Sequence, residues 1–297
     1  MDPKPLFDRF KRKPTAPPSA ELASALAQLD RLGTSRPELL DPSRQLGRLL
    51  AAGFSVPGDA TLRPEAISQA VEGWAEAKSA FSVVMPDLGE ARAGERFRAL
   101  LEVGDDSNPG IGPLRAFAGR KGFDPTSWSV DALSGRPDRL EESARQAGLD
   151  PLLVGSMLRL ALLPALARLS KRLEEARTGD WDRGDCPNCA SRPLLAESRG
   201  LEQRIVLRCG LCASEWPWER LRCPSCGENT AKALHYSFVE GEQERYRLAH
   251  CDTCRWDWKV VASLGPISTP GLIVADLASI HLDLVLEVRK LATDEHG

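Results

Sequence analysis

The spacing of apolar residues divides this chain into a helical first part and a strand-like second part. Up to about residue 180, apolar residues recur every three or four positions, the period of an amphipathic helix. Examples are Leu22, Leu26 and Leu29 in one segment and Ile67, Val71, Trp74 and Phe81 in another. Further on, short apolar runs such as residues 205–207 lead directly into cysteines, which is typical of short strands.

Helix boundaries can be predicted at several points. Asp41-Pro42 supplies an N-cap followed by proline at the first helical position, and Gly53 follows as a stop signal. Asp150-Pro151 repeats this device before a long apolar helix, which Pro164 is expected to kink. After the last cysteine, the pattern predicts one closing helix from about Val274 to Ala292.

The length and the placement of the cysteines predict the domain organisation. A chain of 297 residues exceeds the usual size of one domain, and all eight cysteines lie between Cys186 and Cys254. The predicted fold class is α+β, with a helical N-terminal domain, two tandem metal-binding modules and a closing helix. The predicted parts are a basic, proline-rich arm (1–18), an all-helical domain (19–180), a first module (181–220), a second module (221–264) and a C-terminal segment with its helix (265–297).

Composition and charge exclude some classes of function. The chain is 42% hydrophobic and 27% charged, as expected of a soluble globular protein, and its formal net charge is -3. Proteins whose main task is to neutralise phosphates carry a basic excess, so nucleic-acid binding is disfavoured. Residues 184–260 contain eleven basic and eleven acidic side chains, which weakens that function further.

The sequence predicts a cytoplasmic protein that does not insert into a membrane. The N-terminus begins with charged and proline residues and does not resemble a signal peptide. The longest apolar run, Leu152 to Leu163, is shorter than the roughly 20 residues that cross a bilayer. In a reducing compartment cysteines are expected to remain thiols or to bind metal.

The cysteines form four Cys-x-x-Cys pairs, separated by nineteen, ten and twenty-four residues. Two intervening residues allow a tight turn to aim both sulfur atoms at one ion, so four pairs predict two tetrahedral sites. The predicted metal ligands are Cys186, Cys189, Cys209 and Cys212 at the first ion, and Cys223, Cys226, Cys251 and Cys254 at the second. We predict no catalytic residues and no organic cofactor site.

The long gaps between the pairs favour this grouping. Each gap reads as a hairpin between two cysteine turns, and the whole unit recurs from Cys186 to Cys223 as an internal duplication. An interleaved grouping is the alternative. Tetrathiolate sites suit Zn²⁺, rubredoxin-type iron or an iron-sulfur cluster. The spacing does not distinguish these metals, and zinc is favoured because it is the common structural metal of such ribbons.

Aromatic and histidine residues near the cysteines allow two interpretations each. Four tryptophans follow the second turn of each unit and are expected to pack over the metal sites rather than form a binding surface: Trp216, Trp218, Trp256 and Trp258. His235 and His250 are expected to be hydrogen-bonded or solvated, because eight thiolates already complete two sites. Closed shells also argue against catalysis at the metal.

These motifs resemble the formate dehydrogenase accessory proteins of the FdhE type. The resemblance lies in Cys186-Pro-Asn-Cys189-Ala-Ser-Arg-Pro193, in Cys209 to Cys226 with Ser214-Glu215-Trp216 and Arg220 between the pairs, in Cys251-Asp-Thr-Cys254, and in Ala275 to Asp283. Ala190 and Arg255 depart from it, since rubredoxin typically has glycine there. The resemblance covers roughly the last 110 residues.

The resemblance implies a fold, a partner and a metal. It implies a helical domain joined to two rubredoxin-like modules, and binding to the catalytic subunit of a molybdenum-dependent formate dehydrogenase before export. It also implies iron at the eight cysteines, with zinc as the alternative. The hypothesis is therefore a non-enzymatic accessory protein; the competing hypotheses are a zinc-ribbon adaptor in transcription or RNA handling and a thiol oxidoreductase.

Overall fold

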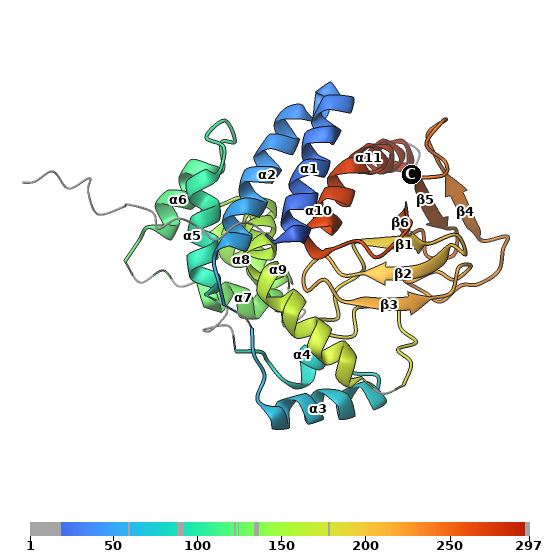
Figure 1. Cartoon of the computed structure of the whole chain (residues 1–297), viewed down its shortest axis with the longest axis horizontal. Helices are drawn as coiled ribbons and strands as arrows, with labels where there is room; N and C mark the ends of the chain where they lie inside the picture. Colours follow the sequence, from blue (N-terminus) through green and yellow to red (C-terminus); the bar gives the residue numbers. More distant parts are fainter. Residues whose placement is uncertain are drawn as a thin grey trace, which may run out of the picture.

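The computed structural model describes residues 19–58, 60–87, 92–121, 123, 125–133, 137–177 and 179–294. Helices fill one side of the molecule and a six-stranded sheet fills the other (Figure 1). Of the two C-terminal helices, the first lies between the helical side and the sheet, and the second lies beside the sheet. The predicted α+β fold class is thereby confirmed. The proposed arm at residues 1–18 lies outside the described part of the chain.

The helical part begins at residue 20 and ends at residue 176. Its elements are α1 (Ala20–Ser35), the 3-10 turn η2 (Pro37–Leu39), α2 (Leu40–Ser55), α3 (Pro64–Ala75), α4 (Ala80–Val83), α5 (Ala93–Val103), α6 (Ile111–Ala118), α7 (Pro125–Leu133), α8 (Pro137–Gln146) and α9 (Pro151–Ala176).

Helix α9 is the central element of this part. The carboxylate of Asp150 caps it by accepting a hydrogen bond from the N–H of Leu152 at 2.9 Å, as predicted, and the helix continues through Pro164. Its length and composition alone would allow it to cross a membrane, but 61% of its most apolar 18-residue window is buried inside the protein. That is the pattern of a core helix.

Three predicted helix features are wrong. Helix α2 begins at Leu40 and not at Asp41, because the turn of η2 runs straight into it without a side-chain cap. Gly53 does not end α2; it lies inside the helix, where an added Cβ would be 3.5 Å from Leu100 and from the carbonyl oxygen of Leu160. The single segment expected up to Phe81 is two helices, α3 and α4.

The six strands form one sheet in the order β3-β2-β1-β6-β5-β4. The strands are β1 (Leu195–Arg199), β2 (Arg204–Arg208), β3 (Glu215–Trp218), β4 (Leu234–Ser237), β5 (Tyr246–Cys251) and β6 (Asp257–Ser263). Two antiparallel three-stranded ribbons, β1–β3 and β4–β6, correspond to the two cysteine units. The parallel pairing of β1 with β6 joins them, with Ala196 opposite Val260. The exact domain boundaries remain a proposal.

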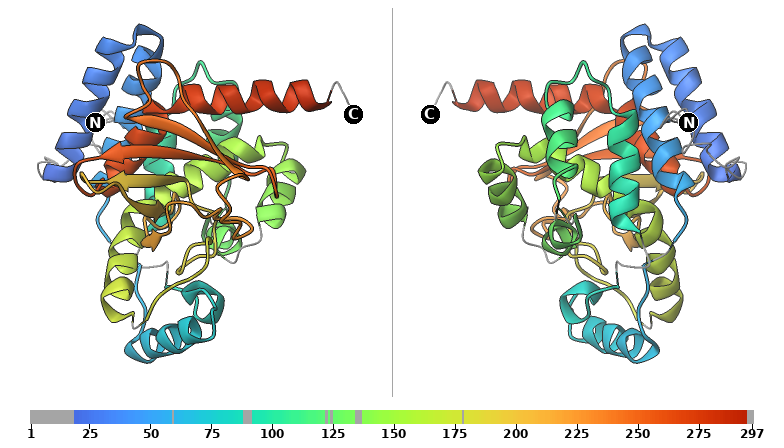
Figure 2. Two further views of the ribbon diagram at one scale, coloured as in Figure 1. Left: turned by 90° about the vertical axis from the view of Figure 1, so that its right-hand side faces the viewer. Right: turned by 90° about the vertical axis from the view of Figure 1, so that its left-hand side faces the viewer.

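The closing segment is two helices, not the single helix predicted from Val274. Helix α10 (Thr269–Ala278) starts earlier because Ser268 caps it and Pro270 occupies its first turn, and α11 (Ile280–Asp294) follows after a bend of 48° at Ser279. Figure 2 shows α11 extending across the molecule on the side opposite α3. Residues of α10 and α11 pack against Leu195, Leu248 and other apolar side chains of one sheet face.

A buried ionic network connects the ribbons on that face. Glu197 of β1 is fully buried and accepts hydrogen bonds from Arg199, from Arg208 of β2, from Ser263 of β6 at 2.7 Å, and from the N–H of Ile267 at 3.0 Å. Burial favours the neutral acid, but the hydrogen bonds and the nearby guanidinium groups hold the pKa of Glu197 below its usual value. The carboxylate therefore ties β1 to both of its neighbours.

Replacing Glu197 with Ala is expected to lower the free energy of unfolding by about 3–5 kcal/mol, because it leaves the buried guanidinium of Arg208 without its main counter-ion. Urea unfolding followed by tryptophan fluorescence would measure this change. Glu202→Ala is the matched control, since Glu202 pairs with Arg204 in solvent and should cost less than about 1 kcal/mol. Equal losses in the two variants would contradict the structural role of the network.

Candidate metal centres

Each Cys-x-x-Cys pair forms the same backbone turn, called a knuckle below. In every knuckle the N–H four residues after the first cysteine donates to that cysteine's carbonyl oxygen. These donors are Ala190 at 3.0 Å, Ala213 at 3.1 Å, Gly227 at 3.0 Å and Arg255 at 2.7 Å. The first cysteine's own N–H donates to the carbonyl oxygen five residues on, at 2.7–3.0 Å. Four equivalent turns thus present their thiols in the same way.

The donor residue at the end of each knuckle has a left-handed backbone. Its φ is 57° at Ala190, 58° at Ala213, 77° at Gly227 and 57° at Arg255. Glycine adopts this conformation most easily, and other residues do so at a cost of about 1 kcal/mol. The departures from glycine at Ala190 and Arg255 therefore leave the turn intact.

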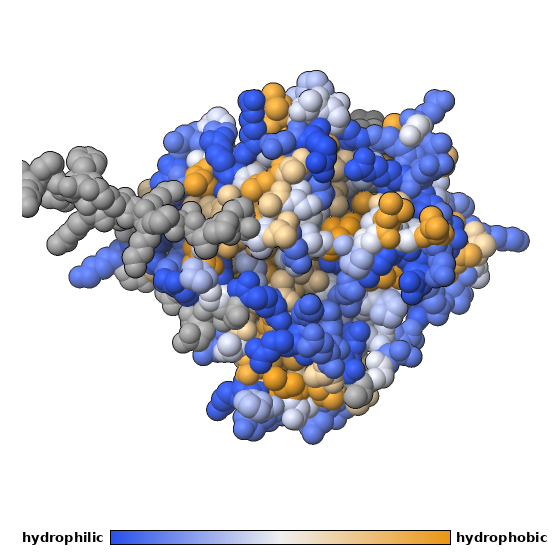
Figure 3. Space-filling model, viewed as in Figure 1, coloured by the Kyte–Doolittle hydropathy of each residue, from blue (hydrophilic) through white to orange (hydrophobic). Residues whose placement is uncertain are grey.

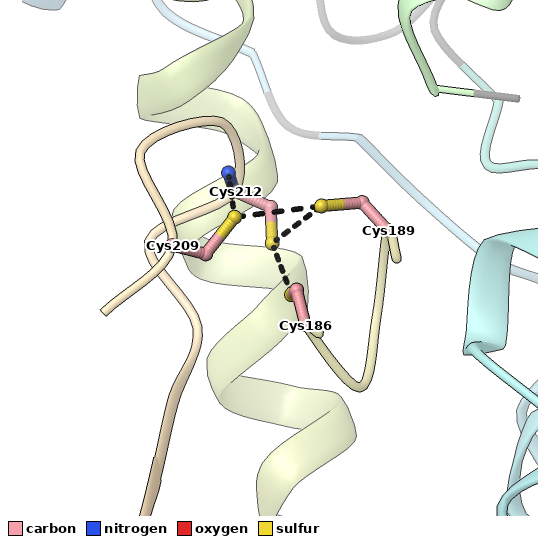
Figure 4. Close-up of side chains that lie close together, drawn as sticks. All are labelled: Cys186, Cys189, Cys209 and Cys212. Carbon is pink, nitrogen blue, oxygen red and sulfur yellow. Dashed lines mark hydrogen bonds between the residues drawn. The ribbon is translucent and has the colours of Figure 1, made fainter. Parts of the chain in front are cut away.

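The structure gathers the cysteines into the two groups expected from their spacing. The first group is Cys186, Cys189, Cys209 and Cys212, and the second group is Cys223, Cys226, Cys251 and Cys254. In each group the sulfur atoms all lie within 4.8 Å of one another. Figure 4 shows the four side chains of the first group pointing toward one another.

The distances between sulfur atoms fit a tetrahedral ion. In the first group, Sγ of Cys186 lies 3.5 Å from Sγ of Cys212, and Sγ of Cys189 lies 3.4 Å from that of Cys209. The corresponding contacts of the second group, Cys223 to Cys254 and Cys226 to Cys251, are 3.6 and 3.7 Å. Metal–sulfur bonds of about 2.3 Å place the corners of a tetrahedron about 3.8 Å apart.

Backbone amides support negative charge on these sulfur atoms. The N–H groups of Leu211 and Cys212 donate to Sγ of Cys209 at 3.4 and 3.5 Å, and the N–H of Ser225 donates to Sγ of Cys223 at 3.4 Å. Without a cation, burial raises the pKa of the Cys186 thiol well above its usual value. A bound ion would offset that burial cost, so both groups could hold a metal as thiolates.

The two groups differ in their exposure. All four cysteines of the first group are buried, with at most 1% of any residue exposed. In the second group Cys226 is exposed and Cys254 is partly exposed. The second group therefore lies at the protein surface, while the first is enclosed.

The helical part encloses the first group through direct backbone contacts. The indole N–H of Trp74 and the N–H of Ala80 both donate to the carbonyl oxygen of Pro187 at 2.8 Å, and the N–H of Phe81 donates to that of Asn188 at 2.7 Å. The side chain of Asn188 in turn donates to Ser214 of the neighbouring knuckle at 2.6 Å. Helices α3 and α4 thus hold the first knuckle in place.

Packing of the tryptophans agrees with the expected structural role for most of them. Trp216 is 1% exposed and donates to the carbonyl oxygen of Arg183 at 3.1 Å, while Trp258 is 7% exposed and stacks on Trp256. Trp218 donates to the carbonyl oxygen of Arg222 at 2.8 Å. The four tryptophans pack in the same apolar cluster as cysteines of both groups.

The two histidines are hydrogen-bonded, as expected, and belong to neither cysteine group. His235 contacts the carboxylate of Asp252 at 2.8 Å, and His250 contacts that of Asp257 at 2.9 Å.

Sequence reasoning missed two other residues near the cysteine groups. Gly184 lies against the second unit so closely that an added Cβ would be 1.7 Å from the carbonyl oxygen of Pro224. Such a long-range approach leaves no local signal in the sequence.

Glu174 is the second residue that sequence reasoning missed. It lies near the end of α9 and accepts a hydrogen bond from the N–H of Glu215 at 3.0 Å, close to the first group. Burial, helped by negative charge at Cys212 and Glu215, raises the pKa of Glu174 to about 7. Its charge state thus changes near neutral pH.

The fold and the two groups define a class of protein: a helical bundle fused to a double, rubredoxin-like module with eight clustered cysteines. Comparison with known proteins agrees. No family model matches the chain. The FdhE homolog of Stutzerimonas stutzeri is 33% identical to this chain, and the match covers 54% of this chain and 50% of that protein. The FdhE homolog of Aquifex aeolicus is 30% identical, and the match covers 35% of this chain and 37% of that protein.

The solved structure of the FdhE protein from Pseudomonas aeruginosa has the same fold, with a TM-score of 0.65, 24% identity and 91% of each chain covered. The chain spans half or less of the length of the curated relatives just named. The predicted resemblance to FdhE proteins is confirmed by similarity over about half of this chain, and the likeness in fold extends over 91% of it.

Metal is expected to leave the second group before the first, because chelators reach an exposed thiolate more easily than a buried one. After loading with two ions, release to a chromogenic chelator should show one fast and one slow phase of equal size. Cys226→Ser should remove the fast phase while the protein stays folded. A single rate for both ions in the unaltered protein would contradict the difference in enclosure.

Replacing Glu174 with Gln is expected to stabilise the protein above neutral pH. Because the pKa of Glu174 is higher in the folded than in the unfolded protein, the free energy of unfolding falls by up to about 3 kcal/mol as pH rises from about 4.5 to about 7. Gln stays neutral over this range and still accepts the hydrogen bond from the N–H of Glu215. Urea unfolding between about pH 5.5 and 8.5 measures this. Glu175→Gln, at an exposed neighbour, is the control; identical pH profiles for both variants would contradict the effect.

Proposed function

We propose that this chain is a non-enzymatic accessory protein that binds the catalytic subunit of a molybdenum-dependent formate dehydrogenase and is needed for its assembly or activity. The proteins that it resembles carry the FdhE name. The observation that supports the proposal most is the conjunction of this fold, shared over 91% of the chain, with two complete cysteine groups. The proposed place of action is the cytoplasm.

The eight cysteines are the proposed metal ligands, four to each ion. Iron of the rubredoxin type is favoured by the resemblance, and zinc is the alternative. When bound, iron would supply one-electron chemistry, whereas zinc would only stabilise the fold. This chain's own contribution is to hold four thiolates in each group, donate N–H groups to their sulfur atoms and exclude water from the first group.

A role in binding rather than catalysis is supported by the chemistry of the cysteine groups. A catalytic metal keeps an open coordination position beside a general base, whereas four thiolates close the shell. His235 and His250 are hydrogen-bonded to the carboxylates of Asp252 and Asp257, and neither histidine belongs to a cysteine group. The helical domain at residues 19–180 then serves as the proposed scaffold that holds the modules.

The alternative is a zinc-ribbon adaptor that binds nucleic acid. The balance of eleven basic against eleven acidic side chains in residues 184–260 disfavours it, because phosphate recognition requires a basic surface. Arginines in this region are also paired, such as Arg199 with Glu197 at 2.9 Å. The proposal for a protein partner therefore has the stronger support.

Copurification tests the proposal. The protein, tagged and prepared without oxygen, is expected to retain the formate dehydrogenase catalytic subunit from cells that make both, and to contain two metal ions per chain. Two irons with a thiolate-to-iron absorption band support a redox role, and two zincs restrict the sites to stabilising the fold. A salt-sensitive shift of nucleic acid together with no retention of the subunit would overturn the proposal in favour of the adaptor.

A further inference from the structure

The face of the sheet that α10 and α11 leave uncovered carries a groove of about 620 Å³. Its lining residues come from both ribbons and from the loops beside them: Ile205, Arg220, Leu221, Tyr236, Phe238, Gln243, Arg247 and Val260. Strand register places Ile205, Val260 and Arg247 on one face, because directly paired residues point to the same side.

The groove exists because the seam between the ribbons carries small side chains on this face. Ser198 of β1 lies opposite Ile205 on one side and Ala262 of β6 on the other, and Ala196 lies opposite Val260. Taller side chains stand on either side of this seam, including Tyr236 of β4. The joining of two ribbons by β1 and β6 thus leaves a hollow between them.

The wall of the groove is apolar and open to solvent. Phe238 is 56% exposed and Leu221 is 47% exposed, although both are large hydrophobic side chains. The Tyr236 hydroxyl donates to the carbonyl oxygen of Arg220 at 3.0 Å, which fixes the loop on one side. Exposed apolar side chains that line a fixed groove are typical of protein-binding sites. Figure 3 shows that, on the face seen in Figure 1, apolar side chains lie scattered among hydrophilic ones over both the helices and the sheet.

Two arginines give the groove a positive rim. Within the described part of the chain, no carboxylate forms an ion pair with Arg220 or Arg247. Arg220 donates to the side-chain oxygen of Gln203 at 3.0 Å, and the Arg247 guanidinium lies 5.9 Å from the centroid of the Tyr236 ring. Both charges are therefore available to a negatively charged partner.

We propose that this groove binds a segment of the partner protein in which large apolar side chains alternate with Asp or Glu. The apolar side chains would fill the hollow, and the carboxylates would pair with Arg220 and Arg247. The protein's own residues 1–18 do not fit this requirement, because they carry five Lys and Arg against two Asp. This inference rests on the proposed function, since the partner is the formate dehydrogenase catalytic subunit.

Site-specific photocrosslinking tests the inference. The photoreactive residue p-benzoylphenylalanine replaces Phe238 in the full chain, and Leu201, which is 94% exposed and absent from the lining of the groove, is the matched control position. Crosslinking to the catalytic subunit is expected from position 238 and not from position 201. Mass spectrometry should locate the crosslink in a segment with adjacent acidic and large apolar residues.

A charge reversal supplies the second arm of the test. The double variant Arg220→Glu, Arg247→Glu is expected to weaken binding of the subunit at least about tenfold, with a smaller salt dependence, because like charges then meet across the groove. The matched control is Arg204→Glu on β2, whose side chain is 77% exposed and is not part of the groove. This control should bind as the unaltered protein does.

Each other outcome overturns a specific claim. Equal binding of the subunit by the double variant and the unaltered protein would overturn the groove while leaving the proposed function intact. Crosslinks from position 238 to residues 1–18 or to a second copy of this chain would overturn the proposed occupant. Absence of any binding by the unaltered protein would instead overturn the proposed function.

Discussion

The structure depends on the parallel pairing of β1 with β6. Each ribbon alone would be a three-stranded sheet with two open edges and little core. Pairing Ala196 with Val260 makes one continuous sheet, and Glu197 secures the joint by accepting hydrogen bonds from strands on both sides of it. One face can then bury apolar side chains under α10 and α11, while the other retains the groove.

The same joint sets the two cysteine groups in different surroundings. The first group lies between the sheet and the helical part, where Trp74 and Phe81 bond to its knuckle. The second group lies at the outer end of the second ribbon, with Cys226 in solvent. A duplicated unit thus provides one enclosed site that binds the two parts of the protein together and one site that partners can approach. The same Cys-x-x-Cys pattern therefore forms a buried site in one unit and an exposed site in the other, because the two units contact different parts of the protein.

Local features of the site could be predicted from the sequence, whereas features that depend on distant contacts could not. The Cys-x-x-Cys spacing and the strands beside it predict the two groups because the backbone hydrogen bonds that form each turn span only four or five residues. The Asp150 cap was predictable for the same reason. Gly53 and Gly184 instead face residues far away in the chain, so their signals were misread or missed. The β1–β6 register has no local determinant at all.

The order of pairing in the sheet has a consequence for synthesis on the ribosome. Strand β1 emerges first, but its partner β6 follows 64 residues later, counted from Ala196 to Val260. Until then the first ribbon exposes an unpaired edge, and long-range pairing of this kind is slow. The complete sheet can form only after β6 has been synthesised. A chain truncated before β6 would therefore expose the edge of β1 and be prone to aggregation.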